Sequence, residues 1–246
     1  MPTNENQVLR YGQLKGLAAT EEQMTLINRQ SLRELAAQEV FTFKIAACNN
    51  QVDRDFERFT DETLQELSKL YVGKTVIADH NWTAGNQCAR VYDALVEPMA
   101  GTAGGKQLVL LCYMLKNADT QSTIDAIEGG ILREVSVGCS CREAICNICG
   151  ADKRKTYCEH RRGADYGGAT CVVELKAATD AYEVSFVAVP AQPAAGVTKT
   201  YGGEENKPPE SQGSSATDKN LDLKIKQWEA SLFVLAQEEN ETEEKE

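Results

Sequence analysis

The sequence predicts an α+β fold, mainly an antiparallel β-sheet or barrel with a few flanking helices. About seven short segments rich in β-branched and aromatic residues occur with only about three or four helical segments, and no steady alternation of strand and helix appears. The composition, 42% apolar and 26% charged residues over 246 positions, is that of a globular protein. Disordered and fibrous chains are therefore excluded.

The chain before the first strand is predicted to contain one short helix. Residues 1–20 are polar without a sustained period and are expected to form a flexible arm. Ser31 followed by Glu34 has the spacing of a capping box, which predicts a helix over 31–37. The β-branched and aromatic run at 40–47 predicts a strand.

A helix and a strand are then predicted to lead to the first histidine. Thr60 can cap a helix whose leucines recur at helical spacing, and Gly73 lies where such a helix would end. The short apolar strand at 75–78 places His80 at the edge of the sheet, where a substrate can reach it.

The rest of the domain is predicted to hold further strands and one helix. The cysteine-rich stretch at 139–171 interrupts the sheet and is expected to be an insertion, and residues 21–197 together form one predicted domain. The predicted strands are 89–96, 108–115, 133–141, 171–177 and 182–189, and the predicted helix is 119–128.

The composition changes abruptly near residue 198. Glycine, proline and serine pairs interrupt a polar stretch over 198–220, which predicts a disordered linker. Residues 221–246 are predicted to form an amphipathic helix, with Trp228 and Leu232 on its apolar face, followed by an acidic tail. Because an isolated helix of this length is marginal in water, it is expected to dock on a partner, on a second copy of the chain or on its own domain.

Charge and hydropathy exclude two kinds of binding surface. The 37 acidic and 26 basic residues give a net charge of −11, which argues against a protein that coats nucleic acid or an anionic membrane. No apolar run approaches the roughly 20 residues that span a bilayer, and the first residues are polar where a secretory signal is apolar. A soluble, intracellular protein without a membrane or nucleic-acid partner is therefore expected.

Three polar side chains are candidates for catalysis, and each has a structural alternative. His80 can act as a base or can merely cap its strand. Ser136 lies on the polar face of an alternating strand beside Gly138, where a substrate backbone can approach. A serine needs a positioned base to become a nucleophile, and otherwise Ser136 simply faces solvent. Glu183 lies in an otherwise apolar strand and needs a partner, either an imidazole or a basic surface residue.

The most specific local signal is a group of cysteine and histidine residues. Nine cysteines are many for an intracellular chain, and their clustering indicates bound metal rather than a disulfide framework. Cys146-x2-Cys149 and Cys158-x-His160 form two ligand pairs whose separation suits a tetrahedral, structural zinc ion.

The remaining cysteines and the basic residues near this group have several interpretations. Cys139, Cys141 and Cys171 are possible substitute ligands, and the more distant cysteines are expected to fill the core. The basic residues at 153–155 and 161–162 can contact a phosphate backbone, dock an acidic protein segment or simply face solvent. The distant cysteines are Cys48, Cys88 and Cys112.

The order of these parts resembles the prohead, or capsid maturation, proteases of tailed phages, a family related in fold to herpesvirus assemblin. The resemblance covers roughly residues 40–197. Its motifs are a strand ending in histidine (Val76-Ile77-Ala78-Asp79-His80), a Ser-x-Gly strand (Ser136-Val137-Gly138) and a Glu-x-Ser-x-Val strand (Glu183-Val184-Ser185-Phe186-Val187) leading into Pro190-Ala191. The Asp53-Arg54-Asp55 turn also resembles family members. Gln192, where asparagine is common, and the cysteine-rich insertion depart from the family pattern.

The resemblance implies an assemblin-like serine endopeptidase with Ser136 as nucleophile and His80 as general base. The third catalytic residue that the resemblance implies is Glu183 or His160. We favour Glu183, because a metal-bound imidazole cannot also orient His80.

The implied substrates are scaffold segments, the major capsid protein and the chain itself. The implied location is the immature capsid in the host cytoplasm. The C-terminal helix would then recognise a capsid or scaffold partner, and self-cleavage in the linker would release it.

Two alternatives have different chemistry. A catalytically inactive, zinc-containing assembly or nucleic-acid-binding protein could keep the same fold, although the joint presence of His80, Ser136 and Glu183 favours the enzyme. A zinc hydrolase is disfavoured, because the chain has only two histidines and no His-Glu-x-x-His helix.

Overall fold

The computed structural model describes residues 19–198. The expected flexible arm at 1–20 lies outside them except for its last two positions. The predicted linker at 198–220 lies outside them except for its first position, and the predicted helix and acidic tail at 221–246 lie wholly outside. Within the described residues, no helix is both long and apolar enough to cross a membrane.

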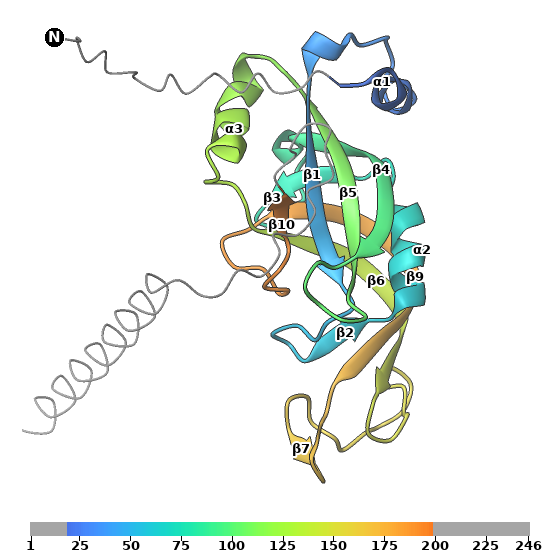
Figure 1. Ribbon diagram of the computed structural model, residues 1–246. Helices are drawn as coiled ribbons and strands as arrows, with labels where there is room; N and C mark the ends of the chain where they lie inside the picture. Colours follow the sequence, from blue (N-terminus) through green and yellow to red (C-terminus); the bar gives the residue numbers. More distant parts are fainter. Residues whose placement is uncertain (1–18, 199–246) are drawn as a thin grey trace, which may run out of the picture. The chain divides into compact units, whose positions relative to one another are not determined.

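The described residues form an α+β fold, as predicted, in which a mixed sheet carries three α-helices (Figure 1). The helices are α1 (Glu21–Asn28), α2 (Asp61–Tyr71) and α3 (Ala118–Glu128), with short 3₁₀ helices at Ala37–Glu39 and Ala84–Asn86. The strands are β1 (Val40–Asn49), β2 (Glu57–Phe59), β3 (Thr75–Ala78), β4 (Ala89–Pro98), β5 (Lys106–Leu115), β6 (Val135–Cys146), β7 (Asp165–Tyr166), β8 (Ala169–Thr170), β9 (Val173–Phe186) and β10 (Gly196–Thr198).

The main sheet curves into a ring. Its strands follow the order β10, β1, β5, β4, β3, β9 and β2, and β6 pairs with the other edge of β9. Just before β6, Glu134 bridges Gly196 of β10, and the Val197 N–H donates to the Arg133 carbonyl at 2.8 Å. These contacts join β6 to β10, which agrees with the barrel form of the prediction.

Two strand pairs differ from the antiparallel expectation. β9 runs parallel to β3 and to β2, whereas the other ladders of the sheet are antiparallel. Hydrophobic alternation locates a strand but carries no information about which distant strand lies beside it. The parallel pairing matters because it brings the end of β3 next to the end of β9.

The α2 helix packs into the larger hydrophobic core. The Thr60 side chain accepts a hydrogen bond from the Thr63 N–H and caps the helix, as predicted. Leu64, Leu67 and Tyr71 recur at helical spacing and are completely buried. This face contacts β9, β4 and β5, so the helix supports the strands that carry the candidate site.

The helix predicted at 31–37 is wrong. The Ser31 hydroxyl donates to the carbonyl of Arg33 at 2.6 Å instead of capping a helix. The Asn28 side chain accepts the Leu35 N–H at 2.9 Å, which holds this segment as a loop. The capping box of this region belongs to Thr20 and Gln23 at the start of α1, a helix that the sequence analysis assigned to no element.

The strands predicted at 171–177 and 182–189 are one continuous strand, β9. The two predictions left residues 178–181 between them, which include the polar residues Thr179 and Asp180. In the structure the pairing with β6 shifts register twice around these positions, and the Thr179 hydroxyl lies 2.7 Å from that of Ser140. β-Bulges accommodate such extra residues without ending a strand.

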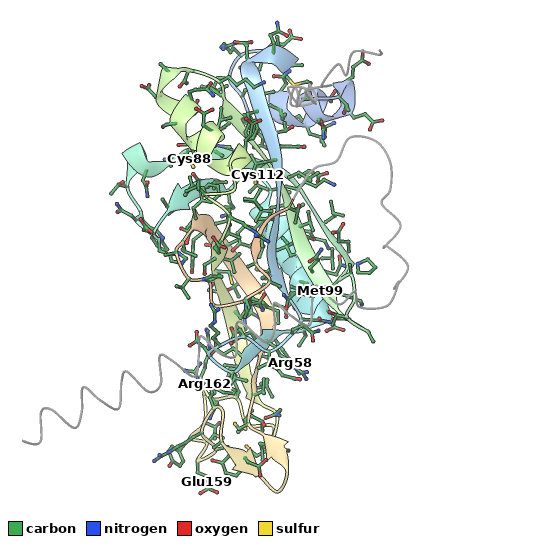
Figure 2. The ribbon with its side chains drawn as sticks, turned by 60° about the vertical axis from the view of Figure 1, so that its left-hand side comes forward. Arg58, Cys88, Met99, Cys112, Glu159 and Arg162 are labelled. Carbon is green, nitrogen blue, oxygen red and sulfur yellow. The ribbon has the colours of Figure 1, made fainter. Side chains whose placement is uncertain are left out.

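The insertion extends from the end of the β6–β9 ladder, where Cys146 pairs with Val173 (Figure 1). It contains the small β7–β8 hairpin. The Val173 N–H donates to the Phe56 carbonyl at 2.9 Å, and Arg162 forms an ion pair with Glu57. Figure 2 shows Arg162 where the insertion joins the sheet and Glu159 at its far end. The insertion is therefore anchored to the first residue of β2 and to the turn before it.

Candidate functional site

The three predicted catalytic residues come from three adjacent strands. His80 follows β3, Glu183 lies in β9, and Ser136 is the second residue of β6. β9 lies between the other two strands, because it pairs with β3 on one edge and with β6 on the other. The fold thus brings side chains from distant parts of the sequence to one region of the sheet.

The His80 imidazole is bound to the Glu183 carboxylate. Its Nδ1 lies 2.8 Å from Glu183 Oε1. The Glu183 side chain is only 3% exposed, whereas that of His80 is 44% exposed. An ionised carboxylate can only accept, so beside it Nδ1 is the donor, and in the neutral imidazole the lone pair then lies on Nε2. A half-exposed imidazole held in this tautomer is suited to accept a proton at Nε2.

A buried serine completes this cluster. The Ser185 hydroxyl donates to Glu183 Oε2 at 2.6 Å and accepts the His80 backbone N–H at 3.1 Å. Ser185 belongs to the Glu-x-Ser-x-Val motif, which by itself predicts no role for it. Its position two residues after Glu183 was the available signal, because residues i and i+2 of a strand share a face.

The backbone at the end of β3 has an uncommon conformation. Asp79 and His80 both have positive φ values, of 54° and 51°. The Asp79 N–H donates to the Phe186 carbonyl of β9 at 2.9 Å, and the Asn81 N–H donates to the Ala78 carbonyl at 3.0 Å. Left-handed backbone at non-glycine residues requires such support and is frequent at functional sites.

Ser136 lies directly across from Ser185 in the antiparallel pairing. Side chains at directly opposed positions project from the same face, so the Ser136 hydroxyl lies on the face that carries Glu183 and Ser185. Ser136 is partly exposed. Within residues 19–198, no hydrogen bond joins it to His80. Hydrogen bonds of this kind are often long in the absence of substrate.

Gly138 makes room for the carboxylate. It lies opposite Glu183, and a Cβ atom at this position would stand 2.4 Å from Glu183 Oε1. The sequence predicts that Gly138 lets a substrate backbone approach, and the structure adds this second, steric reason for a glycine. Its carbonyl accepts the Tyr71 hydroxyl at 3.0 Å. Burial raises the pKa of Tyr71 well above its usual value, which keeps the hydroxyl a donor.

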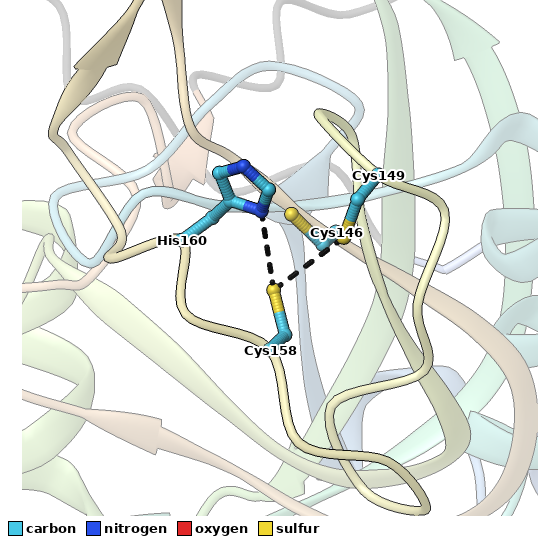
Figure 3. Close-up of side chains that lie close together, drawn as sticks. All are labelled: Cys146, Cys149, Cys158 and His160. Atoms are coloured by element: carbon cyan, nitrogen blue, oxygen red, sulfur yellow. Dashed lines mark hydrogen bonds between the residues drawn. The ribbon is translucent and has the colours of Figure 1, made fainter.

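The second candidate site is the cysteine and histidine group of the insertion. The ligand atoms of Cys146, Cys149, Cys158 and His160 all lie within 4.8 Å of one another (Figure 3). Cys158 Sγ is 3.5 Å from Cys149 Sγ and 3.5 Å from His160 Nδ1. Around a tetrahedral zinc ion, two thiolates stand about 3.8 Å apart, and a thiolate and an imidazole nitrogen about 3.6 Å. The four residues predicted from spacing therefore fit a metal such as zinc.

The turn that holds the first ligand favours a thiolate. The Gly150 N–H donates to the Cys146 carbonyl at 2.8 Å, and Gly150 has a φ of 73°, so the glycine relieves a tight turn. Burial raises the pKa of the Cys146 thiol, but hydrogen bonds from the backbone N–H groups of Cys149 and Ile148 help to lower it to about 6. A thiolate is the form that binds a metal.

The other cysteines lie outside this ligand set. Cys171 is a close neighbour, with its sulfur 3.8 Å from that of Cys146, but it does not belong to the mutually close group of four. Cys139 and Cys141 do not belong to it either. Cys48 and Cys112 are buried in the core, and Figure 2 shows Cys88 and Cys112 far from the insertion.

No protein-family model, curated protein or solved structure matches this chain. The chemistry of both sites therefore has to be inferred from their own geometry.

Several basic side chains of the insertion bind groups of the domain itself. Lys153 donates to the carbonyl of His160, Lys155 lies 3.0 Å from Asp152, and Arg162 pairs with Glu57. These contacts favour a structural role for the three side chains over a role in binding phosphate or an acidic segment.

The two candidate sites lie at opposite ends of the same pair of strands. The stretch of β6 from Ser136 to Cys146 spans roughly 30 Å at about 3.3 Å per residue. A metal held by Cys146 therefore cannot touch a substrate bound at Ser136.

Proposed function

We propose that this protein is a serine endopeptidase of the prohead maturation type, with an assemblin-like fold. Its substrates would be scaffold segments, the major capsid protein and the chain itself, inside the immature capsid in the host cytoplasm. The observation that carries the proposal is the contact between His80 Nδ1 and the buried Glu183 carboxylate, on the strand next to Ser136.

The proposed mechanism follows from the tautomer that this contact imposes. His80 Nε2 accepts the proton of Ser136, whose oxygen attacks the peptide carbonyl. Glu183 orients the imidazole and stabilises its positive charge. The protonated His80 then gives its proton to the leaving amine, and water releases the acyl group in the reverse sequence.

Contacts between the motif segments support the family resemblance. The Arg54 N–H donates to the Ala191 carbonyl at 3.1 Å, and the Arg54 guanidinium donates to the Pro190 carbonyl. Gln192 is buried and bonds both backbone groups of Asn49, at 2.6 and 3.0 Å. The Asp-Arg-Asp turn and the Pro-Ala segment, which sequence alone lists separately, thus support each other structurally, and glutamine serves at the position where asparagine is common.

A zinc ion would serve the insertion rather than the reaction. Cys146, Cys149, Cys158 and His160 would hold it, and four protein ligands leave no open position for water or substrate. Stabilisation of a small insertion with few apolar residues is the role expected of such an ion.

Labelling with a fluorophosphonate tests the nucleophile without knowledge of the natural substrate. We expect the wild-type chain to gain one adduct on the peptide that contains Ser136, as detected by mass spectrometry. Ser136→Ala should gain none. Ser140→Ala is the matched control, because it removes another hydroxyl of β6 and should label normally.

Processing of the capsid protein tests the substrate class. Co-expression with the neighbouring capsid gene should give truncated products with the wild-type chain but not with Ser136→Ala. If a protein that still binds metal shows neither labelling nor processing, the result favours the alternative of an inactive assembly or nucleic-acid-binding protein. Labelling without capsid processing would retain a serine hydrolase and reject the prohead substrate.

A further inference from the structure

We propose that Ser185 is a positioning residue for the His80–Glu183 pair. The inference rests on the proposed function only for the effect of Ser185 on the reaction rate. Its effect on the tautomer of the His80 ring can be measured whether or not the protein is an enzyme. Ser185 is completely buried, yet its hydroxyl contacts both members of the pair.

The hydroxyl fixes the carboxylate. Glu183 Oε1 accepts from the His80 ring at 2.8 Å, and Oε2 accepts from Ser185 at 2.6 Å. Both oxygens are therefore occupied, and rotation of the carboxylate about its terminal bond would break two hydrogen bonds. A carboxylate held at both oxygens presents Oε1 to the imidazole in one orientation.

The same hydroxyl fixes the backbone that carries the imidazole. It accepts the His80 N–H at 3.1 Å, at a residue whose φ is 51°. Because a serine hydroxyl has one donor and two acceptor sites, both contacts can form at once. One side chain of β9 thus ties the loop after β3 to the carboxylate, and so determines the separation of ring and carboxylate.

Removal of the hydroxyl has a specific consequence. Ser185→Ala leaves Glu183 Oε2 and the His80 N–H without a partner in a buried place. The carboxylate and the loop after β3 then each lose a hydrogen bond that fixes their position. We expect the rate of proton transfer from Ser136 to fall by about 10- to 100-fold, the rate equivalent of one lost hydrogen bond to a charged group. Binding of the reagent before reaction should not change, because Ser185 is buried.

The kinetic test measures phosphonylation by a fluorophosphonate. A bond forms between Ser136 Oγ and phosphorus, the phosphorus–fluorine bond breaks, fluoride leaves, and the Ser136 proton passes to His80. We expect Ser185→Ala to lower the limiting rate of labelling without changing the concentration for half-maximal rate. Ser185→Thr, which keeps the hydroxyl, should restore most of the rate, and Ser185→Cys, a weaker donor, should lie between. Equal limiting rates in all four proteins would overturn the proposal.

The spectroscopic test does not depend on activity. The chain has only two histidines, so ¹⁵N-histidine labelling gives two imidazoles, and His80→Ala assigns them. In the wild-type protein we expect the His80 ring to be protonated at Nδ1, with a strongly downfield proton. Ser185→Ala should mix the two tautomers and weaken that signal, whereas Ser140→Ala should not.

The outcomes separate this proposal from the proposed function. An unchanged His80 spectrum and an unchanged labelling rate in Ser185→Ala would overturn the positioning role, even if Ser136 is the nucleophile. A wild-type protein that does not label, but whose His80 spectrum changes in Ser185→Ala, would reject the enzyme and retain the positioning role. If Ser185→Ala does not fold, the order of Ser185→Thr and Ser185→Cys in both measurements decides the question.

Discussion

The two histidines of this chain lie near opposite ends of the β6–β9 ladder and have different neighbours. His80 contacts a buried carboxylate through Nδ1, whereas His160 places its Nδ1 3.5 Å from a cysteine sulfur. A carboxylate accepts a hydrogen bond from the ring N–H and leaves the other ring nitrogen free, whereas a group of thiolates is suited to binding a cation. The neighbours of each imidazole, rather than its residue type, therefore determine which chemistry it is suited to: His80 to accepting a proton and His160 to binding a metal.

The two ends of the β6–β9 ladder also differ in the interactions that stabilise them. The His80 cluster depends on strand pairing and buried hydrogen bonds within the main sheet. The insertion has one short strand pair of its own, the β7–β8 hairpin; turn hydrogen bonds and a few contacts to β2 and to the turn before it supply the rest. The insertion should therefore depend on its metal, and the His80 cluster should not.

The largest expected effect concerns the metal. Purified protein should contain about one zinc ion per chain, and Cys149→Ser should contain none by elemental analysis. Structural zinc contributes about 10–16 kcal/mol in small modules, so residues 147–172 should become open to proteolysis. Cys88→Ser, a cysteine outside the ligand set, is the control and should retain the metal. A metal-free wild-type protein with a protease-resistant insertion would contradict the assignment.

The next effect tests the independence of the two histidines. His80→Ala should slow fluorophosphonate labelling of Ser136 by about 10²- to 10⁴-fold, the usual contribution of general-base catalysis, with metal content unchanged. His160→Ala should lose metal and label at nearly the wild-type rate. If His160→Ala were inactive with its metal in place, the separation of the two roles would be wrong.

Glu183→Gln should have a smaller effect on labelling, because an amide preserves the shape but loses the charge that stabilises the imidazolium. We expect a decrease of about 10- to 100-fold, measured by the same labelling assay, with no change in metal content. A fully active Glu183→Gln protein would show that the charge of Glu183 is not required and would remove Glu183 from the proposed catalytic set.

Gly138→Ala tests the steric fit beneath the carboxylate. The added methyl group would approach Glu183 Oε1 to 2.4 Å, so the carboxylate must move away from His80. We expect slower labelling and a loss of about 1–3 kcal/mol in the free energy of unfolding, measured with urea. Gly85→Ala meets no atom within 4 Å and is the matched control. Similar behaviour of the two variants would show that the space over Gly138 is not required.

The smallest expected effect comes from removing the N-cap of α2, which belongs to neither candidate site. Thr60→Ala removes the side chain that accepts the Thr63 N–H, which typically costs about 1 kcal/mol of stability. Labelling rate and metal content should both stay at wild-type values. A change in either would mean that α2 does more than support the sheet.

Local sequence signals predicted much of the fold. The strand at Thr75–Ala78 and the helix after Thr60 follow from side-chain periodicity and capping, which act over a few residues. The prediction of a helix at 31–37 failed because a capping-box pattern does not show whether the helical backbone hydrogen bonds after it are formed. The break expected in β9 failed because pairing with β6 absorbs the extra residues as bulges.

The sequence by itself predicted the group of four candidate metal ligands, because Cys146-x2-Cys149 and Cys158-x-His160 are short spacings that place ligand atoms together through local turns. Only the tertiary structure decided the His80 cluster. His80 and Glu183 are 103 positions apart, and their contact depends on the parallel pairing of β3 with β9, which no local pattern encodes. The role of Ser185 and the steric requirement at Gly138 follow from that same pairing, since both concern atoms that meet only when β9 lies between β3 and β6.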